Sequence, residues 1–170
     1  MPAAIRTRRG LQIFSRKDAP RVDDTTVMSP PALDQPALDA LPEFRAGGGS
    51  VTKLVFGDPG TQGGGGLSLV WVRFAPNYHL PRHSHSIDCL YYIVSGAIRM
   101  GGRNLGPGEG FFVAADAPYG YVAGPDGVEL LEFRAASSFD SRIRETPDGW
   151  SRILDAVRAN RESWAADRID

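Results

Sequence analysis

Residues 81–96 read PRHSHSIDCLYYIVSG, and this stretch determines how the rest of the chain is interpreted. Two histidines stand two residues apart, at His83 and His85, ahead of an apolar run that ends at Gly96. In a β-strand, residues i and i+2 face the same side, roughly 6–7 Å apart. Two imidazoles placed in this way can bind one metal ion. The stretch therefore predicts a strand with a candidate site on one of its faces.

The same parity selects the further residues that share the face of the two histidines. It passes through Cys89 and Tyr91, whereas Asp88 and Tyr92 have the opposite parity. We therefore expect Tyr91, and not Tyr92, to line the interior, and we expect Asp88 to point away. His79 comes shortly before a proline and is expected in a loop near the rim.

Outward from this stretch, short β-rich runs alternate with glycine and proline turns between residue 51 and about residue 136. Such spacing is typical of an all-β sandwich or barrel. No segment with helical periodicity separates the runs, which argues against a parallel βαβ arrangement. The runs are VTKLVF (51–56), LSLVWVRF (67–74), CLYYIVS (89–95), AIRM (97–100), GFFVA (110–114), YGYVA (119–123) and VELLEF (128–133).

The order of these segments resembles the two sequence motifs of the cupin superfamily. Residues 81–96 are similar to the first motif, which has HxH, then an acidic residue, then a strand closed by glycine. Residues 106–121, which begin GPGEG and end PYGY, are similar to the second motif, and a short hairpin (97–105) separates the two. The resemblance covers roughly residues 67–134. It implies an all-β, cupin-type antiparallel jelly-roll β-barrel over residues 51–136.

The resemblance also implies a metal site. Cupins resembling this chain bind Fe, Mn, Ni, Cu or Zn through the two histidines of HxH, a glutamate, and a histidine of the second motif. His83 and His85 match, but Cys89 stands at the glutamate position and Tyr119 at the second-motif histidine position. Three alternatives stay open. A divalent transition metal is held by His83 and His85 with Tyr119 or Cys89; a small molecule is bound without metal; or the barrel only assembles with partners.

The expected function is that of a metal-dependent small-molecule enzyme, with oxygenase, lyase and isomerase chemistry all compatible with the site. Tyr119 and Cys89 are the catalytic candidates. The alternative is a non-catalytic cupin that binds or senses a small ligand. A cysteine at the position of Cys89 also resembles cupin thiol dioxygenases. Those enzymes keep three histidines, however, and this chain has no histidine after His85, which argues against thiol oxidation.

Other side chains are candidates for contact with the substrate. They are Tyr91, by its parity with the histidines, together with Arg73 and Trp71 of the 67–74 run. Trp71, Phe111 and Phe112 are also expected to fill the barrel core.

Two extensions flank the predicted barrel. Residues 1–50 are interrupted by prolines and are interpreted as an extended arm, with one or two helical turns at most within 31–44. Such an arm packs along its own barrel or crosses to a second copy, and we expect a homodimer. Residues 137–170 are predicted to carry a helix, because Thr146 can cap it, Pro147 suits its first position, and tryptophans and aliphatic residues follow with helical periodicity.

Composition narrows the classes of function. The chain has 19 basic and 20 acidic residues and a formal net charge of −1, and its arginines are scattered, so it has no nucleic-acid footprint. No apolar run approaches the roughly 20 residues that cross a bilayer. Charged residues follow the basic start of the chain where a signal peptide would be apolar, so a cytoplasmic protein is expected. Cys89 is the single cysteine, which excludes an intrachain disulfide.

Overall fold

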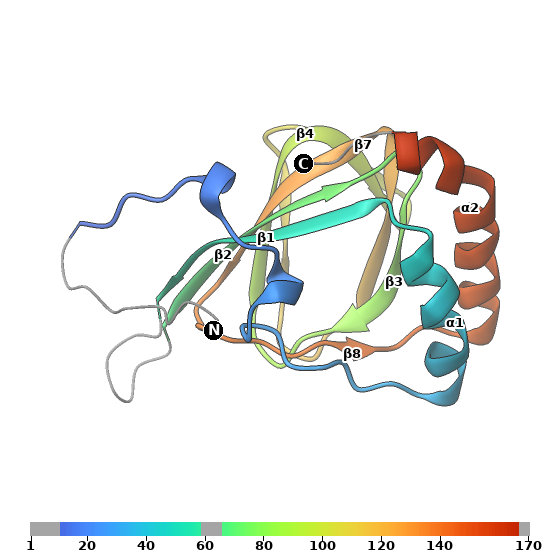
Figure 1. Cartoon of the computed structure of the whole chain (residues 1–170), viewed down its shortest axis with the longest axis horizontal. Helices are drawn as coiled ribbons and strands as arrows, with labels where there is room; N and C mark the ends of the chain where they lie inside the picture. The colour runs from blue at the N-terminus through green and yellow to red at the C-terminus, as the bar shows by residue number, and fades with distance from the viewer. Residues whose placement is uncertain (1–10, 59–65, 167–170) are drawn as a thin grey trace.

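The computed structural model describes residues 11–58 and 66–166, and it places the β-rich runs in one curled antiparallel sheet (Figure 1). Strands pair in the order β1-β2-β7-β3-β8, and β4 pairs with β5, β6 and β7. The fold is therefore an all-β antiparallel jelly-roll barrel, as the sequence predicts. The strands are β1 (Ser50–Asp58), β2 (Leu67–Phe74), β3 (His79–Ser84), β4 (Cys89–Met100), β5 (Arg103–Leu105), β6 (Gly110–Val113), β7 (Tyr119–Arg134) and β8 (Arg142–Ile143).

The long strand β7 joins the two halves of the barrel. Near its start Tyr121 lies opposite Leu80 of β3, and near its end Leu131 lies opposite both Trp71 of β2 and Tyr92 of β4. Alternate residues along these strands fill the interior, which is the periodicity of a strand with one buried face. Val70, Val72, Ile93 and Leu130 are among the most deeply buried of these, each at most 1% exposed.

Two breaks expected between strands are absent. β4 continues through Gly96, and β7 continues through the glycines at 124 and 127. Gly96 has a φ of +71°, and a Cβ there would lie 2.1 Å from the backbone oxygen of Gly127. These glycines therefore mark a close approach of β4 and β7 with a shifted register, and not turns.

β3 is a strand where the sequence led us to expect a rim loop around His79. It contains Pro81, which cannot donate to a ladder, and the pairing of β3 with β7 shifts between Leu80 and His83. The irregular register accommodates the proline within the strand. His79 and His83 consequently stand on one continuous element.

The N-terminal arm is more helical than predicted. Helix α1 (Gln35–Ala46) runs for 12 residues, against the expectation of one or two turns. Asp34 caps it by accepting a hydrogen bond from the Ala37 backbone N–H at 3.0 Å. Ala37, Ala40 and Leu41 are buried against helix α2 (Pro147–Ala166), so tertiary packing extends a segment that its prolines would shorten.

Both extensions pack on their own barrel (Figure 1). The arm makes single β-bridges from Arg21 to Lys53 and from Met28 to Phe139. A short 3₁₀ turn (Arg16–Asp18) precedes the first bridge, and a second (Val22–Asp24) lies between the two. Helix α2 begins as predicted, because the Thr146 hydroxyl accepts a hydrogen bond from the Gly149 N–H at 3.0 Å. Within residues 11–58 and 66–166, no helix is long and apolar enough to cross a membrane.

Candidate functional site

The two histidines of the HxH pair lie side by side inside the barrel. His83 lies near the end of β3 and His85 directly after it, and their ring centroids are 5.0 Å apart. Nδ1 of His83 is 2.8 Å from the Pro81 carbonyl oxygen, and Nδ1 of His85 contacts the Asp140 carbonyl oxygen. A carbonyl oxygen only accepts, so each Nδ1 carries the proton and each Nε2 keeps a lone pair.

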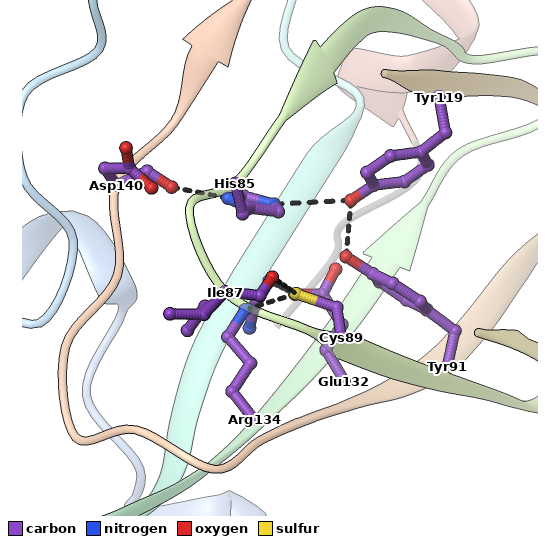
Figure 2. A network of polar contacts seen from close by, with 8 residues as sticks. All are labelled: His85, Ile87, Cys89, Tyr91, Tyr119, Glu132, Arg134 and Asp140. Atoms are coloured by element: carbon purple, nitrogen blue, oxygen red, sulfur yellow. Dashed lines mark hydrogen bonds and ion pairs between the residues drawn. The ribbon is translucent and has the colours of Figure 1, made fainter. Parts of the chain in front are cut away.

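Two tyrosines continue this arrangement. The Tyr119 hydroxyl, from the start of β7, lies 3.3 Å from Nε2 of His85, and it also contacts the Tyr91 hydroxyl from β4. Figure 2 shows the resulting chain from the Asp140 backbone through His85 and Tyr119 to Tyr91. Because Nε2 of His85 is an acceptor, Tyr119 donates to it and Tyr91 donates to Tyr119. His83, His85, Tyr91 and Tyr119 are called the inner cluster below.

A buried ion pair lies beside the inner cluster (Figure 2). Arg134 is 2% exposed; its Nη2 lies 2.6 Å from Oε2 of Glu132, and its Nε donates to the Cys89 sulfur at 3.1 Å. The guanidinium carbon lies 3.9 Å from the centroid of the Phe139 ring. Nη1 of Arg134 has no hydrogen-bond partner among the described residues.

Burial keeps both histidines neutral. It lowers the pKa of His83 to about 3, with a further lowering by the neighbouring His85. Burial, and then the Arg134 guanidinium, also lower the pKa of His85, although its bond to the Asp140 carbonyl opposes this. Both rings therefore present uncharged Nε2 atoms near neutral pH.

The hydroxyl and thiol groups of the site are also neutral. Burial raises the pKa of Tyr119 and of Tyr91 well above 10, and the nearby Glu132 carboxylate raises both further. Burial likewise raises the pKa of the Cys89 thiol, against the opposing effect of Arg134. The charged groups beside the inner cluster are thus Arg134 and Glu132, which neutralise each other.

The two histidines and Tyr119 carry nitrogen and oxygen atoms of the kind that bind metal ions, whereas the Cys89 sulfur already contacts Arg134. Metal-binding histidines usually donate their second ring N–H to a carbonyl or carboxylate, as His83 and His85 do here. Tyr119 contributes an oxygen, with its ring centroid 4.4 Å from that of His83. The Cys89 sulfur instead accepts a hydrogen bond from Arg134. Among the described residues, no group of three or more His, Cys, Asp and Glu is arranged to hold a metal ion.

Of the three proposed substrate-binding residues, the structure places Tyr91 inside the barrel and Trp71 and Arg73 on its outer side. Tyr91 is 1% exposed inside the barrel, whereas Tyr92 points outward, as parity predicts. Trp71 and Arg73 lie on the outer side of β2, because the inward residues there are Val70 and Val72. They do not line the site with the histidines: the Arg16 guanidinium lies over the Trp71 ring, and Arg73 pairs with Glu129 at 3.7 Å.

Sequence reasoning missed the buried ion pair. Glu132 and Arg134 share the parity of Leu130, which is fully buried, so the alternation of VELLEFR (128–134) contained a usable signal. Charged side chains on the inner face of a strand are rare without a partner or a function. No sequence pattern indicates the contact between His85 and Asp140, because Asp140 contributes its backbone carbonyl oxygen.

Comparison with known proteins identifies similar solved structures. Neither a protein-family model nor a curated protein matches the chain. KdgF from Halomonas sp. is 29% identical over 51% of this chain and 81% of its own, with a TM-score of 0.42. An RmlC-like cupin from Shewanella frigidimarina is 23% identical over 52% and 77%, with a TM-score of 0.44. Oxalate decarboxylase from Bacillus subtilis is 20% identical over 52% and 25%, with a TM-score of 0.45.

Proposed function

We propose that this chain, an antiparallel jelly-roll barrel whose sequence motifs resemble those of cupins, is a metal-dependent small-molecule enzyme acting at the inner cluster. The observation that carries the proposal is the state of the two histidines. Backbone carbonyls fix both Nδ1 protons, so His83 and His85 present Nε2 lone pairs within one buried site. This tautomer leaves a lone pair on each Nε2 with which a divalent transition metal can be bound.

His83 and His85 would hold the ion, with Tyr119 as the adjacent oxygen donor. A divalent ion bound there supplies Lewis acidity toward a substrate oxygen. Tyr119 keeps its proton in the metal-free chain and directs it at His85 Nε2, while Tyr91 donates to the same hydroxyl. Tyr119 is therefore the candidate to exchange a proton with a substrate. Phe111 stacks on Tyr91, with ring centroids 4.5 Å apart, and shields this end of the site from water.

Elemental analysis of protein purified without a metal-affinity tag tests the proposal. We expect near-stoichiometric metal in the wild type and its loss in His83→Ala. His79→Ala is the matched control, since it changes the same residue type on the same strand, outside the inner cluster. The proposal is contradicted if the wild type holds no metal even after incubation with Fe, Mn, Ni, Cu or Zn. It is also contradicted if His83→Ala retains its metal.

A second candidate function is a non-catalytic cupin that binds or senses a small ligand without metal. The contact between Arg134 and Cys89 favours it. Cys89 stands at the position where the resemblance implies a glutamate ligand, and its sulfur accepts a hydrogen bond from the Arg134 guanidinium. This candidate predicts a metal-free wild type. It also predicts that ligand affinity survives Tyr119→Phe or His83→Ala, whereas the metal enzyme loses turnover with either change.

A further inference from the structure

A groove on the outside of the barrel lies between the sheet and the start of helix α2. It has a volume of about 760 Å³ and is lined by β3, by the beginning of β7, by the end of β4 and by the first turns of α2, which stands beside β3 (Figure 1). Sites for small molecules typically have volumes of about 300–1,000 Å³. The groove is therefore large enough to hold a small organic ligand.

Strand pairing sets the floor of the groove. Val122 of β7 lies opposite His79 of β3 on one side and opposite Arg99 of β4 on the other. Directly opposed residues in antiparallel strands project their side chains on the same side. The two neighbours of Val122, Tyr121 and Ala123, are buried in the barrel core. His79, Val122 and Arg99 consequently share the outer face, with the small Val122 side chain between the two larger ones.

Three arginines from three different elements line the groove. They are Arg82 of β3, Arg99 of β4 and Arg152 of α2, and all three are exposed. The charges of Arg99 and Arg152 both lower the pKa of His79, after the larger effect of its burial, so these two arginines converge on one imidazole from the sheet and from the helix. Within residues 11–58 and 66–166, no carboxylate pairs with any of the three guanidinium groups.

The one carboxylate that lines the groove is bonded to the backbone. Oε2 of Glu145 accepts a hydrogen bond from the Arg82 backbone N–H at 2.8 Å, and Oε1 accepts one from the Thr146 backbone N–H at 2.9 Å. Three guanidinium charges against one carboxylate leave the groove with two uncompensated positive charges. Other surface arginines do have carboxylate partners: Arg142 pairs with Asp140, and Arg158 with Glu43.

The overall composition does not account for this positive groove. The chain has a formal net charge of −1, so basic residues are not in excess. A concave surface lined by charges of one sign concentrates ions of the opposite sign. The groove therefore has the electrostatics of a site for an anion with a charge of about −2.

The arrangement of the arginines favours a tetrahedral anion. A carboxylate presents two oxygens in one plane, which suit the fork of a single guanidinium. A phosphate monoester presents three terminal oxygens and carries a charge of about −1.5 to −2 near neutral pH. Guanidinium groups that come from β3, β4 and α2 match it both in the number of acceptor oxygens and in charge.

We propose that this groove binds a small phosphate monoester. Arg82, Arg99 and Arg152 bind the phosphate group, and Val122 and Ile153 offer apolar surface to its carbon skeleton. The site is separate from the inner cluster. Tyr119 lines both, but its hydroxyl is directed inward, where it contacts Tyr91 and His85.

Isothermal titration calorimetry at low ionic strength, with glucose 6-phosphate as the probe, tests the proposal. We expect one site per chain with a dissociation constant below about 1 mM. Arg99→Gln and Arg152→Gln should each weaken binding by about tenfold or more, because each removes a charged donor to the phosphate. Arg161→Gln is the matched control, since Arg161 is exposed on the same helix and does not line the groove. Wild type that does not bind the probe saturably, or arginine variants that bind it as the wild type does, would overturn the proposal.

Two comparisons test the place and the chemistry of binding. Val122→Trp fills the floor of the groove without changing its charge and should abolish binding, whereas an undiminished affinity would mean diffuse attraction to surface arginines and would overturn the site. Succinate is a dianion without a tetrahedral group and should bind about tenfold more weakly than glucose 6-phosphate. Equal affinity for succinate would overturn the assignment of a phosphate.

A His83→Ala variant separates the groove from the inner cluster. A phosphate bound to a metal ion in the barrel would lose its site in this variant, whereas binding in the groove should be unchanged. Loss of glucose 6-phosphate binding in His83→Ala, with circular dichroism showing a folded chain, would contradict the groove. A metal-free wild type would contradict the proposed function and leave the expected groove affinity as it is.

Discussion

The two faces of strand β4 contrast sharply. Cys89 and Tyr91, with polar groups, point inward and are each 1% exposed, whereas Leu90 and Tyr92 point outward and are about half exposed. Antiparallel sheets with one solvated face normally place apolar residues inside and polar residues outside. At this end of the barrel that pattern is reversed, with polar groups buried and apolar groups exposed.

Strand β7 repeats the reversal. Glu132 and Arg134 face the interior, while Leu131 and Phe133 face outward. Burying a charge and exposing an apolar patch both raise the free energy of an isolated chain. The two faces of the sheet therefore each carry side chains that an isolated barrel would normally place on the other face.

The largest expected difference between the two faces is in the stability that their ion pairs contribute. Arg134→Met leaves Glu132 buried without its partner and should lower the free energy of unfolding by about 3–5 kcal/mol. The outer pair of Arg73 and Glu129 is partly exposed, and Arg73→Met should cost about 1 kcal/mol or less. Urea denaturation followed by circular dichroism measures both. Equal small losses would show that the inner pair is solvated and would remove the contrast.

Acid should destabilise the inner face selectively in metal-free protein. The folded pKa of His83 is about 3, below the ordinary value of 6.5, so only the unfolded chain takes up this proton as the pH falls below 6.5. Stability is therefore full above that pH and declines below it, by about 2 kcal/mol at pH 5.

A His83→Gln variant isolates this contribution. Its loss of stability between pH 7.5 and pH 5 should be about 2 kcal/mol smaller than that of the wild type, because carboxylates contribute equally to both. His79→Gln should behave more like the wild type than His83→Gln does. Burial also lowers the pKa of His79, but the His79 side chain is less buried than that of His83. Identical pH profiles for wild type and His83→Gln would mean that the ring is accessible to water.

The smallest expected effect comes from two adjacent tyrosines. Tyr91→Phe removes the hydroxyl that donates to Tyr119 and should cost about 1 kcal/mol. Tyr92→Phe removes an outward hydroxyl and should change stability by less than about 0.5 kcal/mol. Thermal and urea unfolding of the pair measures the difference. A larger loss in Tyr92→Phe would reverse the assignment of the two faces.

Some features of the site could be predicted because they depend on local periodicity. The spacing of His83 and His85, and the parity that selects Tyr91 over Tyr92, are properties of any strand. Strand periodicity could not say that Phe112 would be exposed, and we expected it in the core; it is 61% exposed. The position of Trp71 on the outer side was missed for the same reason, because parity alternates without saying which face is inside.

The sequence by itself determined an all-β chain, the segment that carries the site, and the helix that begins after Thr146. These follow from residue types at short spacings, where strand and helix geometry leave few choices. Only the tertiary structure decided which groups meet. Tyr119 reaches His85 because β7 pairs with β3, and Arg134 reaches Cys89 because β7 also pairs with β4. Contacts between residues 34 and 45 positions apart depend on strand register across the whole barrel, which no local pattern encodes.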